Sequence, residues 1–544
     1  MAITAADLKF FDSERMTDDA NAGGRRGANA LLTGDDNNVW PPVDEDASLL
    51  GARHLRKIYP SVVAESADAL RSATTLVDSV PDDAKLHVAL VQNGDQNTVR
   101  FEVAALVPTN IETWVAYNGS NTPRVSNATI DGGSTTLTIA ADVARAQLDL
   151  GYSGSGATLL VLEHAGGKHY TPVVETEVGI GGSEQERDVE IAVPFPGATV
   201  GVAVTVKRLY AAATPRIYGC CSLLGEQASG ASTLLLQMPV IRLSGSAWAK
   251  AFAEGDVCTI WHEAETTPAT QANSDVINAG RTDLAQLALV DDDDNEIARA
   301  YANGPAVSGV GATFDLAAGT VTCTDVSGWA QPVRLRHRIE QRVALDAVDL
   351  EYNFSGNGTG TLFGGGSDST YDPPTVTLAA PLARTFPAGS YLSSEVPHGT
   401  LQGTVPLQFS QQAWTRVWSD SVIGAAVGAL YVGDIALTAE GAESDRWACV
   451  FTSATQYTLH SERWGVVGTG NVGSDYVPLS PATNQPLMTL AAAGWVLGGI
   501  ALGNVLRFNT VGAYAPAWAN RYAEPGATEG PGSVRLRLRG SVDA

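Results

Sequence analysis

The sequence has little charge, little cysteine and little lysine. Charged residues make up 17% of the 544 residues, against roughly 25% in ordinary soluble domains. The five cysteines form no C-x-x-C pair, which argues against a disulfide framework and against a zinc site. Lysine occurs six times and not once after Lys250, so arginine supplies most of the positive charge. The cysteine content fits a chain that folds in a reducing cytoplasm.

Long helical runs rich in Glu and Lys are absent, and so is an export signal. Residues 1–19 lack the charged and then apolar order of a signal peptide. The apolar run 487–506 has about the length that crosses a bilayer, but its four glycines and Asn504 fit Gly-rich strands and turns better. We therefore expect no stable insertion into a membrane.

The motifs that mark common catalytic and ligand sites are missing as well. There is no phosphate-binding G-x-x-x-x-G-K-[ST] loop and no G-x-S-x-G elbow for a serine nucleophile. His262 and Glu263 begin a zincin motif, but Thr266 occupies the place of its second histidine. An acidic run starts at Asp291, but Glu296 occupies the place that a calcium loop gives to glycine. We therefore expect no enzyme, with no catalytic, cofactor-binding or metal-ligating residue and no cofactor.

The net charge of −25, with a pI near 4.6, bounds the possible partners. A nucleic-acid binder normally carries a basic patch or a positive net charge, because phosphate contacts supply much of the affinity. An anionic membrane surface repels an acidic chain for the same reason. We therefore expect no nucleic acid among the partners.

What the sequence does contain favours strands and turns. Glycine occurs 56 times, and short alternating runs such as KLHVALVQ, TTLTIA and TLLVLEH are bounded by Gly, Asn, Ser or Pro. Such runs at short spacing are typical of sandwiches and barrels. The sequence predicts a mainly β chain of several β-sandwich or barrel-like domains, with an extended N-terminal arm and few short helices.

Composition shifts divide the chain into consecutive parts. The acidic, Gly-interrupted start cannot bury enough apolar surface on its own to offset its ordering entropy. The stretch 354–374 is rich in Gly and Ser and is typical of a loop or linker. We expect an arm at 1–52, one or more β-domains at 53–213, a β-domain at 214–353, the loop or linker at 354–374, and a C-terminal β-domain at 375–544.

Two sets of residues are candidates for a subunit interface. Aromatic side chains give the expected arm something with which to dock on a neighbouring subunit; these are Phe10, Phe11 and Trp40. In the terminal run VRLRLRG, alternate residues point to opposite faces of a strand. Its basic face could meet carboxylates of a partner subunit or could simply be solvated; that face holds Arg535, Arg537 and Arg539.

Several segments resemble a family of known proteins. They are LKFFDSERMTDDANAGGR at 8–25 with RKIYPSVV at 56–63, DLAAGTVTCTDVSGWAQPVRLRHRIE at 315–340, FPAGSYLSSEVPHGTLQGTVPLQFSQQAWTRVWSD at 386–420 and GNVLRFNTVGAYAPAWANR at 503–521. The sequence is similar there to baseplate or tail-tip structural proteins of long-tailed (siphovirus and Mu-like transposable) bacteriophages and prophages. The resemblance covers both ends and much of the second half of the chain, but not the region from about 85 to 300.

The resemblance implies a structural virion protein that links the tail end to receptor-binding components during host attachment. It implies synthesis in the host cytoplasm and a place in the tail baseplate. The implied partners are further copies of the chain, in three- or sixfold symmetry, and other tail or baseplate proteins. Two alternatives stay open: a receptor-binding protein that contacts a host surface glycan or pilus, and a virion-associated glycan hydrolase with a carboxylate pair in a cleft.

Overall fold

The computed structural model describes most of the chain outside the region 105–216. The described residues are 3–32, 37–81, 83, 85–92, 96–104, 217–236, 252–292, 296–302, 311–349, 375–427, 430–433, 435–498, 500–523 and 526–542. Elsewhere it describes 133–138 and the backbones of 124–125, 129–130, 139–140, 159–164, 167–177, 186–191, 200–201, 205–208, 353–355 and 370–372. The expected linker 354–374 therefore lies almost entirely outside the described residues.

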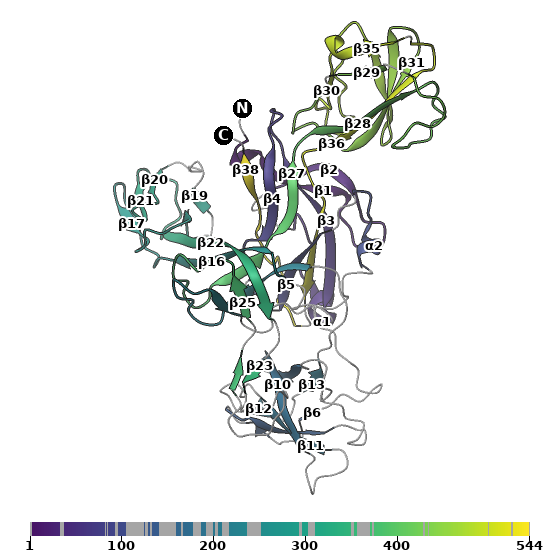
Figure 1. The fold of residues 1–544 in the computed structure, drawn as a ribbon. Coiled ribbons are helices and arrows are strands. Elements are labelled where there is room, and N and C mark those ends of the chain that lie inside the picture. Colours follow the sequence, from purple (N-terminus) through teal and green to yellow (C-terminus); the bar gives the residue numbers. More distant parts are fainter. Residues whose placement is uncertain are drawn as a thin grey trace.

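One continuous antiparallel sheet forms the centre of the molecule (Figure 1). Its strands run in the order β15-β25-β22-β16-β26-β14-β5-β37-β3-β1-β2, with β18 and β19 added beside β22. These strands are β1 (Leu8–Arg15), β2 (Gly23–Leu31), β3 (Ala52–Val62), β5 (Leu86–Gln92), β14 (Ile217–Ser222), β15 (Thr233–Leu235), β16 (Val257–Glu265), β18 (Gln286–Val290), β19 (Glu296–Tyr301), β22 (Arg334–Asp349), β25 (Thr375–Leu378), β26 (Tyr391–Ser394) and β37 (Ala517–Ala523).

The central sheet joins the two ends of the chain. Strand β37, near the C-terminus, pairs on one side with β3 and on the other with β5, both from the first hundred residues. A smaller sheet in the order β27-β4-β38 lies near both termini (Figure 1) and consists of β4 (Leu70–Val77), β27 (Val396–Leu401) and β38 (Leu536–Val542). Apolar residues from early and late segments fill one common core here, because Ile58, Leu90 and Ala519 pack together.

A separate C-terminal domain is built on a five-stranded antiparallel sheet, β28-β36-β31-β32-β33. Its strands are β28 (Thr404–Gln411), β31 (Asp445–Phe451), β32 (Gln456–Ser461), β33 (Gly465–Asn471) and β36 (Val505–Val511), with the short pairs β29 (Leu430–Val432) with β35 (Trp495–Leu497) and β30 (Ile435–Ala436) with β34 (Thr489–Leu490). An aromatic core that includes Trp447, Phe451, Tyr457 and Phe508 fills one face of the sheet. The apolar run 487–506 thus forms strands and turns, as the sequence predicts.

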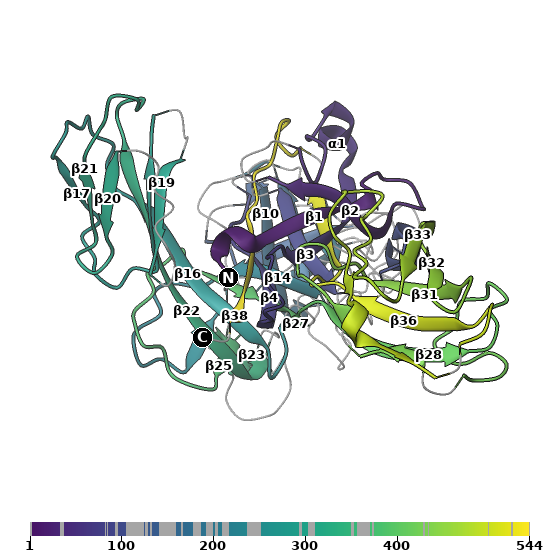
Figure 2. The same ribbon diagram turned by 90° about the horizontal axis from the view of Figure 1, so that it is seen from above.

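A lobe distinct from the C-terminal domain continues the β16–β22 part of the central sheet. It carries a three-stranded sheet of β17 (Val276–Asn278), β21 (Thr320–Cys323) and β20 (Ala312–Asp315). Figures 1 and 2 place this small sheet and the C-terminal domain on opposite sides of the central strands. Leu287, Val321 and Leu335 belong to one buried cluster, so the lobe shares its core with the central sheet.

The remaining strands are described only in part. They are β6 (Arg124–Val125), β7 (Thr129–Ile130), β8 (Thr136–Ala140), β9 (Leu159–His164), β10 (Gly167–Glu177), β11 (Glu186–Ile191), β12 (Val200–Gly201), β13 (Thr205–Arg208), β23 (Asn353–Ser355) and β24 (Thr370–Asp372). Within the described residues there are two short α-helices, α1 (Glu45–Leu50) and α2 (Arg100–Ala104). The prediction of a mainly β chain with several antiparallel sheets and few short helices is confirmed.

The N-terminal segment differs from the expected arm. Strand β1 pairs with β3 on one side and with β2 on the other, so the described part of 1–52 belongs to the chain's own central sheet. The composition argument fails here because β1 pairs with a strand of the interior: residues 55–62 of β3 are all buried. The expected division into consecutive domains differs in the same way, since the central sheet draws strands from 1–52, 53–213, 214–353 and 375–544.

Candidate functional site

The C-terminal strand β38 separates apolar and basic side chains as the sequence predicts. Val534 and Leu536 pack against one apolar cluster, and Leu538 belongs to a neighbouring one. Strand β38 pairs antiparallel with β4, with Leu538 opposite Thr75. The arginines between these apolar residues therefore share the other face of the strand.

That basic face meets carboxylates of the same chain. Arg535 lies 2.6 Å from Glu263 on β16. Arg537 lies 2.7 Å from Asp78, which follows β4, and 2.8 Å from Glu340 on β22. The sequence left two alternatives open for this face, carboxylates of a partner subunit or solvent. The structure places the carboxylates within one chain, because β38 crosses over the polar face of the β16–β22 sheet.

A second carboxylate site anchors the end of the basic face. Glu395 is nearly fully buried and lies 2.8 Å from the Arg342 guanidinium and 3.6 Å from that of Arg539. It also accepts hydrogen bonds of 2.7 Å from the hydroxyls of Thr74 and Thr259. A buried carboxylate needs such complete pairing, because an unpaired charge in the protein interior costs several kcal/mol, by order of magnitude.

Arg338 on β22 forms the centre of this region. It is fully buried, and its side chain donates to both the backbone oxygen and the carboxylate of Asp78, at 2.9 and 2.7 Å. Its guanidinium lies 3.3 Å from Glu340 and 4.5 Å from the centre of the Trp261 ring. The arginine therefore ties β4, β22 and β16 together beneath β38.

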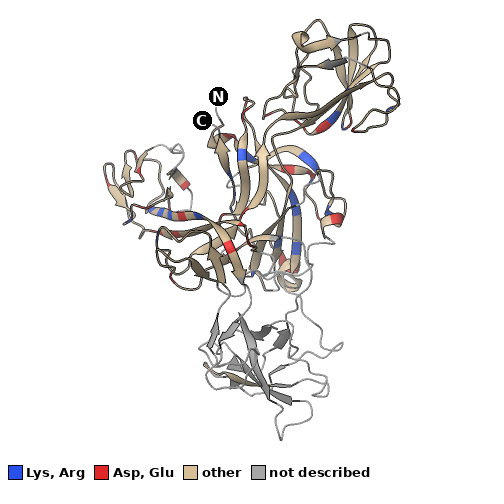
Figure 3. Ribbon diagram, viewed as in Figure 1, with Lys and Arg blue, Asp and Glu red and all other residues tan. Residues whose placement is uncertain are grey.

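Together these groups form what we call the arginine network. Its members come from five segments of the chain, and Figure 3 shows blue and red positions close together along β16 and β22. The network consists of Arg334, Arg336, Arg338, Arg342, Arg535, Arg537 and Arg539 with Asp78, Glu263, Glu265, Glu340 and Glu395. Seven cations thus face five anions.

The electrostatics keep the network in its charged form. Burial alone would raise the pKa of Glu340, but Arg537, Arg539 and Arg338 outweigh it and hold the pKa of that carboxyl below its usual range. Burial opposes the charge of Arg537 in the same way, and Asp78 and Glu340 raise the pKa of its guanidinium above the ordinary value. A carboxylate held ionised in this way is a poor general acid or base at neutral pH. The arrangement holds strands together.

The aromatic residues expected at an interface pack inside the described fold. Trp40 is buried and its indole nitrogen donates to the backbone oxygen of Ala519, at 3.4 Å. Phe10 is half-buried and packs between two apolar clusters of the central sheet. The ring of Phe11 lies 4.8 Å from the Arg26 guanidinium. These side chains anchor the N-terminal strands to the chain's own core, so the expected contact with a neighbouring subunit is not what buries them.

Sequence reasoning missed the partners of β38, although one signal was present. In RLRHRIEQR at 334–342, every second residue is charged, as in the terminal strand. That alternation predicts a strand with one charged face. The register of β16 and β22 places Glu263 opposite Arg338 and Glu265 opposite Arg336, which a single sequence does not reveal.

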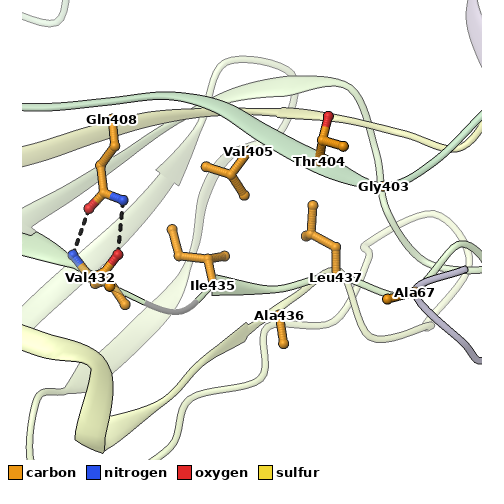
Figure 4. A pocket seen from close by; sticks show the side chains of 10 residues that line it. Ala67, Gly403, Thr404, Val405, Gln408, Val432, Ile435, Ala436 and Leu437 are labelled. Atoms are coloured by element: carbon orange, nitrogen blue, oxygen red, sulfur yellow. Dashed lines mark hydrogen bonds between the residues drawn. The ribbon is translucent and has the colours of Figure 1, made fainter. Parts of the chain in front are cut away.

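An open cavity lies where the C-terminal domain meets the central part (Figure 4). It has a volume of about 430 Å³ and is lined by Ala67, Gly403, Thr404, Val405, Gln408, Val432, Gly433, Ile435, Ala436 and Leu437. The Gln408 side-chain amide both donates to and accepts from the Val432 backbone, at 2.9 and 2.6 Å. None of these lining side chains is charged, so they supply no acid–base chemistry.

The described residues lack two further features. No group of three or more His, Cys, Asp or Glu side chains there is placed to hold a metal ion. Within the same residues, no helix has both the length and the apolar character that crossing a membrane requires.

Comparisons with known proteins add no family. No family model matches the chain, and no curated protein matches it. Among solved structures, that of the infectious bursal disease virus Gt strain aligns over 98% of this chain and 79% of its own, at 7% identity and a TM-score of 0.07. An alignment with so low a score carries no argument about fold or function.

Proposed function

We propose that the chain is a non-enzymatic structural protein of the tail tip or baseplate of a long-tailed bacteriophage, linking the tail end to receptor-binding components. It is made in the host cytoplasm and incorporated in the virion. The observation that carries the proposal is the construction around one continuous sheet, which joins both ends of the chain and carries lobes on opposite sides. Such a body presents several separate faces to neighbours in an assembly.

The segments that resemble tail-tip proteins support the proposal by their position. Residues 8–25 and 56–63 supply β1 and much of β3, and 503–521 supply β36 and the start of β37. Residues 386–420 supply β26, β27 and β28, which lead from the central sheet into the C-terminal domain. The resemblance thus falls largely on the framework that positions the lobes.

The arginine network supports a role in mechanical coupling. Charge-assisted hydrogen bonds from planar guanidiniums fix direction as well as distance. The network connects β38 and β4 with β16, β22 and β26, so it stiffens the junction between two sheets. A protein that transmits force between the tail and its fibres requires such cross-connections.

The test is immunogold electron microscopy of purified particles of the phage or prophage that encodes the chain. The antibody is raised against the folded full-length protein, and an antibody against a known tail protein serves as the positive control. Gold at the distal end of the tail is expected. Particles disrupted by mild denaturant are labelled in parallel, so that buried epitopes are counted too.

Absence of the chain from both intact and disrupted particles, with the control antibody positive, would overturn the virion proposal. A second measurement separates scaffold from receptor binder. Particles from a strain with the gene deleted are expected to lack complete tail tips. Complete tails that only fail to adsorb to cells would instead favour the receptor-binding alternative.

A further inference from the structure

The five-stranded sheet of the C-terminal domain has a second face, opposite its aromatic core. In an antiparallel sheet, residues directly opposite one another on neighbouring strands point to the same side, and successive residues along a strand alternate between sides. Trp447 lies opposite Phe508, and both belong to the core. The neighbours of Phe508 along β36, Arg507 and Asn509, therefore point to the other face, which we call the outer face. The side chains on the outer face show what the domain can contact.

Two rows of side chains cross the outer face. The register gives the first row, which is mainly aromatic and basic, as Phe409, Arg507, Ala448 and His460. It gives the second row, which is mainly polar, as Leu407, Asn509 and Arg446, and Glu462 continues this row at 3.2 Å from the Arg446 guanidinium. Aromatic rings and planar hydrogen-bonding groups therefore lie side by side on one surface.

The loop 412–427 lies over the first row and adds two indole rings to it. The ring centres of Trp414 and Trp418 lie 5.6 and 4.8 Å from the Arg507 guanidinium and 4.8 Å from each other, with their planes at 66°. Arg507 itself is 1% exposed and donates to two backbone oxygens of the loop, at 3.4 and 3.0 Å. The arginine thus fixes the loop from beneath, while both indoles are half-buried and keep part of each ring at the surface.

Asp420 completes the second row from the same loop. Its carboxylate, 54% exposed, accepts two hydrogen bonds from Arg446 and one from the Asn509 amide, each of 2.8 Å. Within the described residues these bonds leave Asp420 an acceptor site, because a carboxylate offers about four. Among the same residues, Arg446 bonds Glu462 through Nη1 and keeps an N–H on Nη2. The Asp420–Arg446 pair is therefore neutral as a whole, fixed in orientation and still able to bind hydroxyl groups.

We propose that the outer face binds an oligosaccharide. The residues that contact it, which we call the outer-face site, are Phe409, Trp414, Trp418, Asp420, Arg446 and Asn509. A sugar ring has a C–H face that packs against an indole, and a rim of hydroxyls that both donate and accept hydrogen bonds. The half-buried indoles supply the first contact, and the Asp420–Arg446 pair supplies partners for the second.

Two further properties of the outer-face site favour this ligand. A site that is fixed before binding loses less conformational entropy when a ligand docks, and Arg507 holds the loop that carries the indoles. A strongly anionic ligand such as a nucleic acid fits less well, because the chain carries a net charge of −25. The binding of a sugar does not depend on the virion role proposed above.

The test is binding of the purified full-length chain to an array of immobilised oligosaccharides, followed by titration with each retained sugar. The array holds neutral oligosaccharides of glucose, mannose, galactose and N-acetylglucosamine, and acidic ones that contain uronic acids. Trp418→Ala removes one stacking ring, and Asp420→Asn keeps the shape of the side chain but removes its charge. The control Phe101→Ala removes an aromatic ring that is 61% exposed on α2, outside the C-terminal domain. We expect wild type and the control to bind with the same Kd and a change in tryptophan fluorescence, and each site variant to raise the Kd at least about tenfold.

Circular dichroism of each variant checks that the substitutions leave the fold intact. A wild-type chain that no sugar of the array retains would overturn the proposal, and so would binding that neither site variant weakens. Retention of acidic sugars alone, abolished by salt and unchanged in Trp418→Ala, would show charge attraction without stacking and would also overturn it. The array result is independent of the immunogold result, so failure of this proposal is distinguishable from failure of the virion proposal.

Discussion

Several buried cations in this protein are held by backbone oxygens and aromatic rings. Arg521 is 2% exposed, donates to the Pro41 oxygen at 2.6 Å and lies over the Trp40 ring. Burial, with a contribution from Arg56, lowers the pKa of Arg521 to about 10. It therefore stays protonated at neutral pH. A sequence does not mark such an arginine as buried, because the groups that compensate it are carbonyls and rings distant along the chain.

His398 on β27 gives a prediction about pH. Burial lowers the pKa of this histidine to about 4, against an ordinary value of 6.5, and its Nε2 lies 2.8 Å from the Thr75 hydroxyl. The unfolded chain therefore takes up a proton on His398 before the folded chain does, and the stability that neutral His398 contributes is lost as the pH falls from about 6.5 towards 4. We expect the urea midpoint to fall over this range by a larger amount in wild type than in His398→Gln.

Parallel curves for wild type and His398→Gln, measured by tryptophan fluorescence at pH 7, 6 and 5, would contradict this prediction. Carboxylates that titrate in the same range affect both proteins alike, so the difference between the two curves isolates the histidine.

At the scale of elements, the terminal strand shows what the sequence predicts and what it does not. The alternation of 534–539 predicts a strand with an apolar and a basic face, and both faces are where that pattern places them. The partner of the basic face depends on Asp78, Glu263 and Glu340, which are between 195 and 460 positions away along the chain. Long-range contacts of this kind follow from topology, which periodicity does not encode.

The excess of arginines over carboxylates in the network leads to a second prediction. Because arginines are in excess, removing a carboxylate increases the uncompensated positive charge, whereas removing an arginine at the edge of the network decreases it. Asp78→Asn takes the carboxylate from fully buried Arg338 and from Arg537, both 2.7 Å away. We expect it to destabilise the chain by about 3–5 kcal/mol. Arg336→Gln, at a partly exposed side chain paired with Glu265, is expected to cost at most about 1 kcal/mol.

Guanidinium unfolding curves of the two variants measure this difference. Equal shifts for Asp78→Asn and Arg336→Gln would show that the network does not carry buried charge. Proteolysis of residues 534–542 in the native state provides an independent readout, because loss of Asp78 should release β38 first.

At the scale of the whole molecule, the β1–β2 hairpin fastens the C-terminal domain. The Arg26 guanidinium lies between the rings of Phe11 and Tyr514 and is 2.8 Å from the buried Glu443 carboxylate. Beside it, Arg25 lies 3.0 Å from Asp445. The acidic N-terminal segment, expected from the sequence to dock on another subunit, instead docks on a distant domain of its own chain.

Replacing this arginine should loosen the domain junction. Arg26→Met leaves Glu443 with the longer ion pair to Arg463, at 3.5 Å, and with the hydrogen bond from the Tyr514 hydroxyl, at 2.9 Å. We expect hydrogen exchange of 439–445 and 510–514 to quicken at least about tenfold, equivalent to about 1.4 kcal/mol of local stability. Arg15→Met, at an exposed position of β1, is the control. Unchanged exchange in Arg26→Met, or equal acceleration in the control, would show that the hairpin does not fasten the domain.

The pairing of β3 with β37 also determines when the central sheet can be completed during synthesis. Ile58 on β3 lies opposite Ala517 on β37, 459 residues later in the chain. At about 5–20 residues per second, roughly half a minute to a minute and a half separates their emergence from the ribosome. Throughout that interval β3 and β5 lack the strand that pairs with both of them. The central sheet therefore cannot be completed until β37 has been synthesised, when nearly all of the chain has left the ribosome.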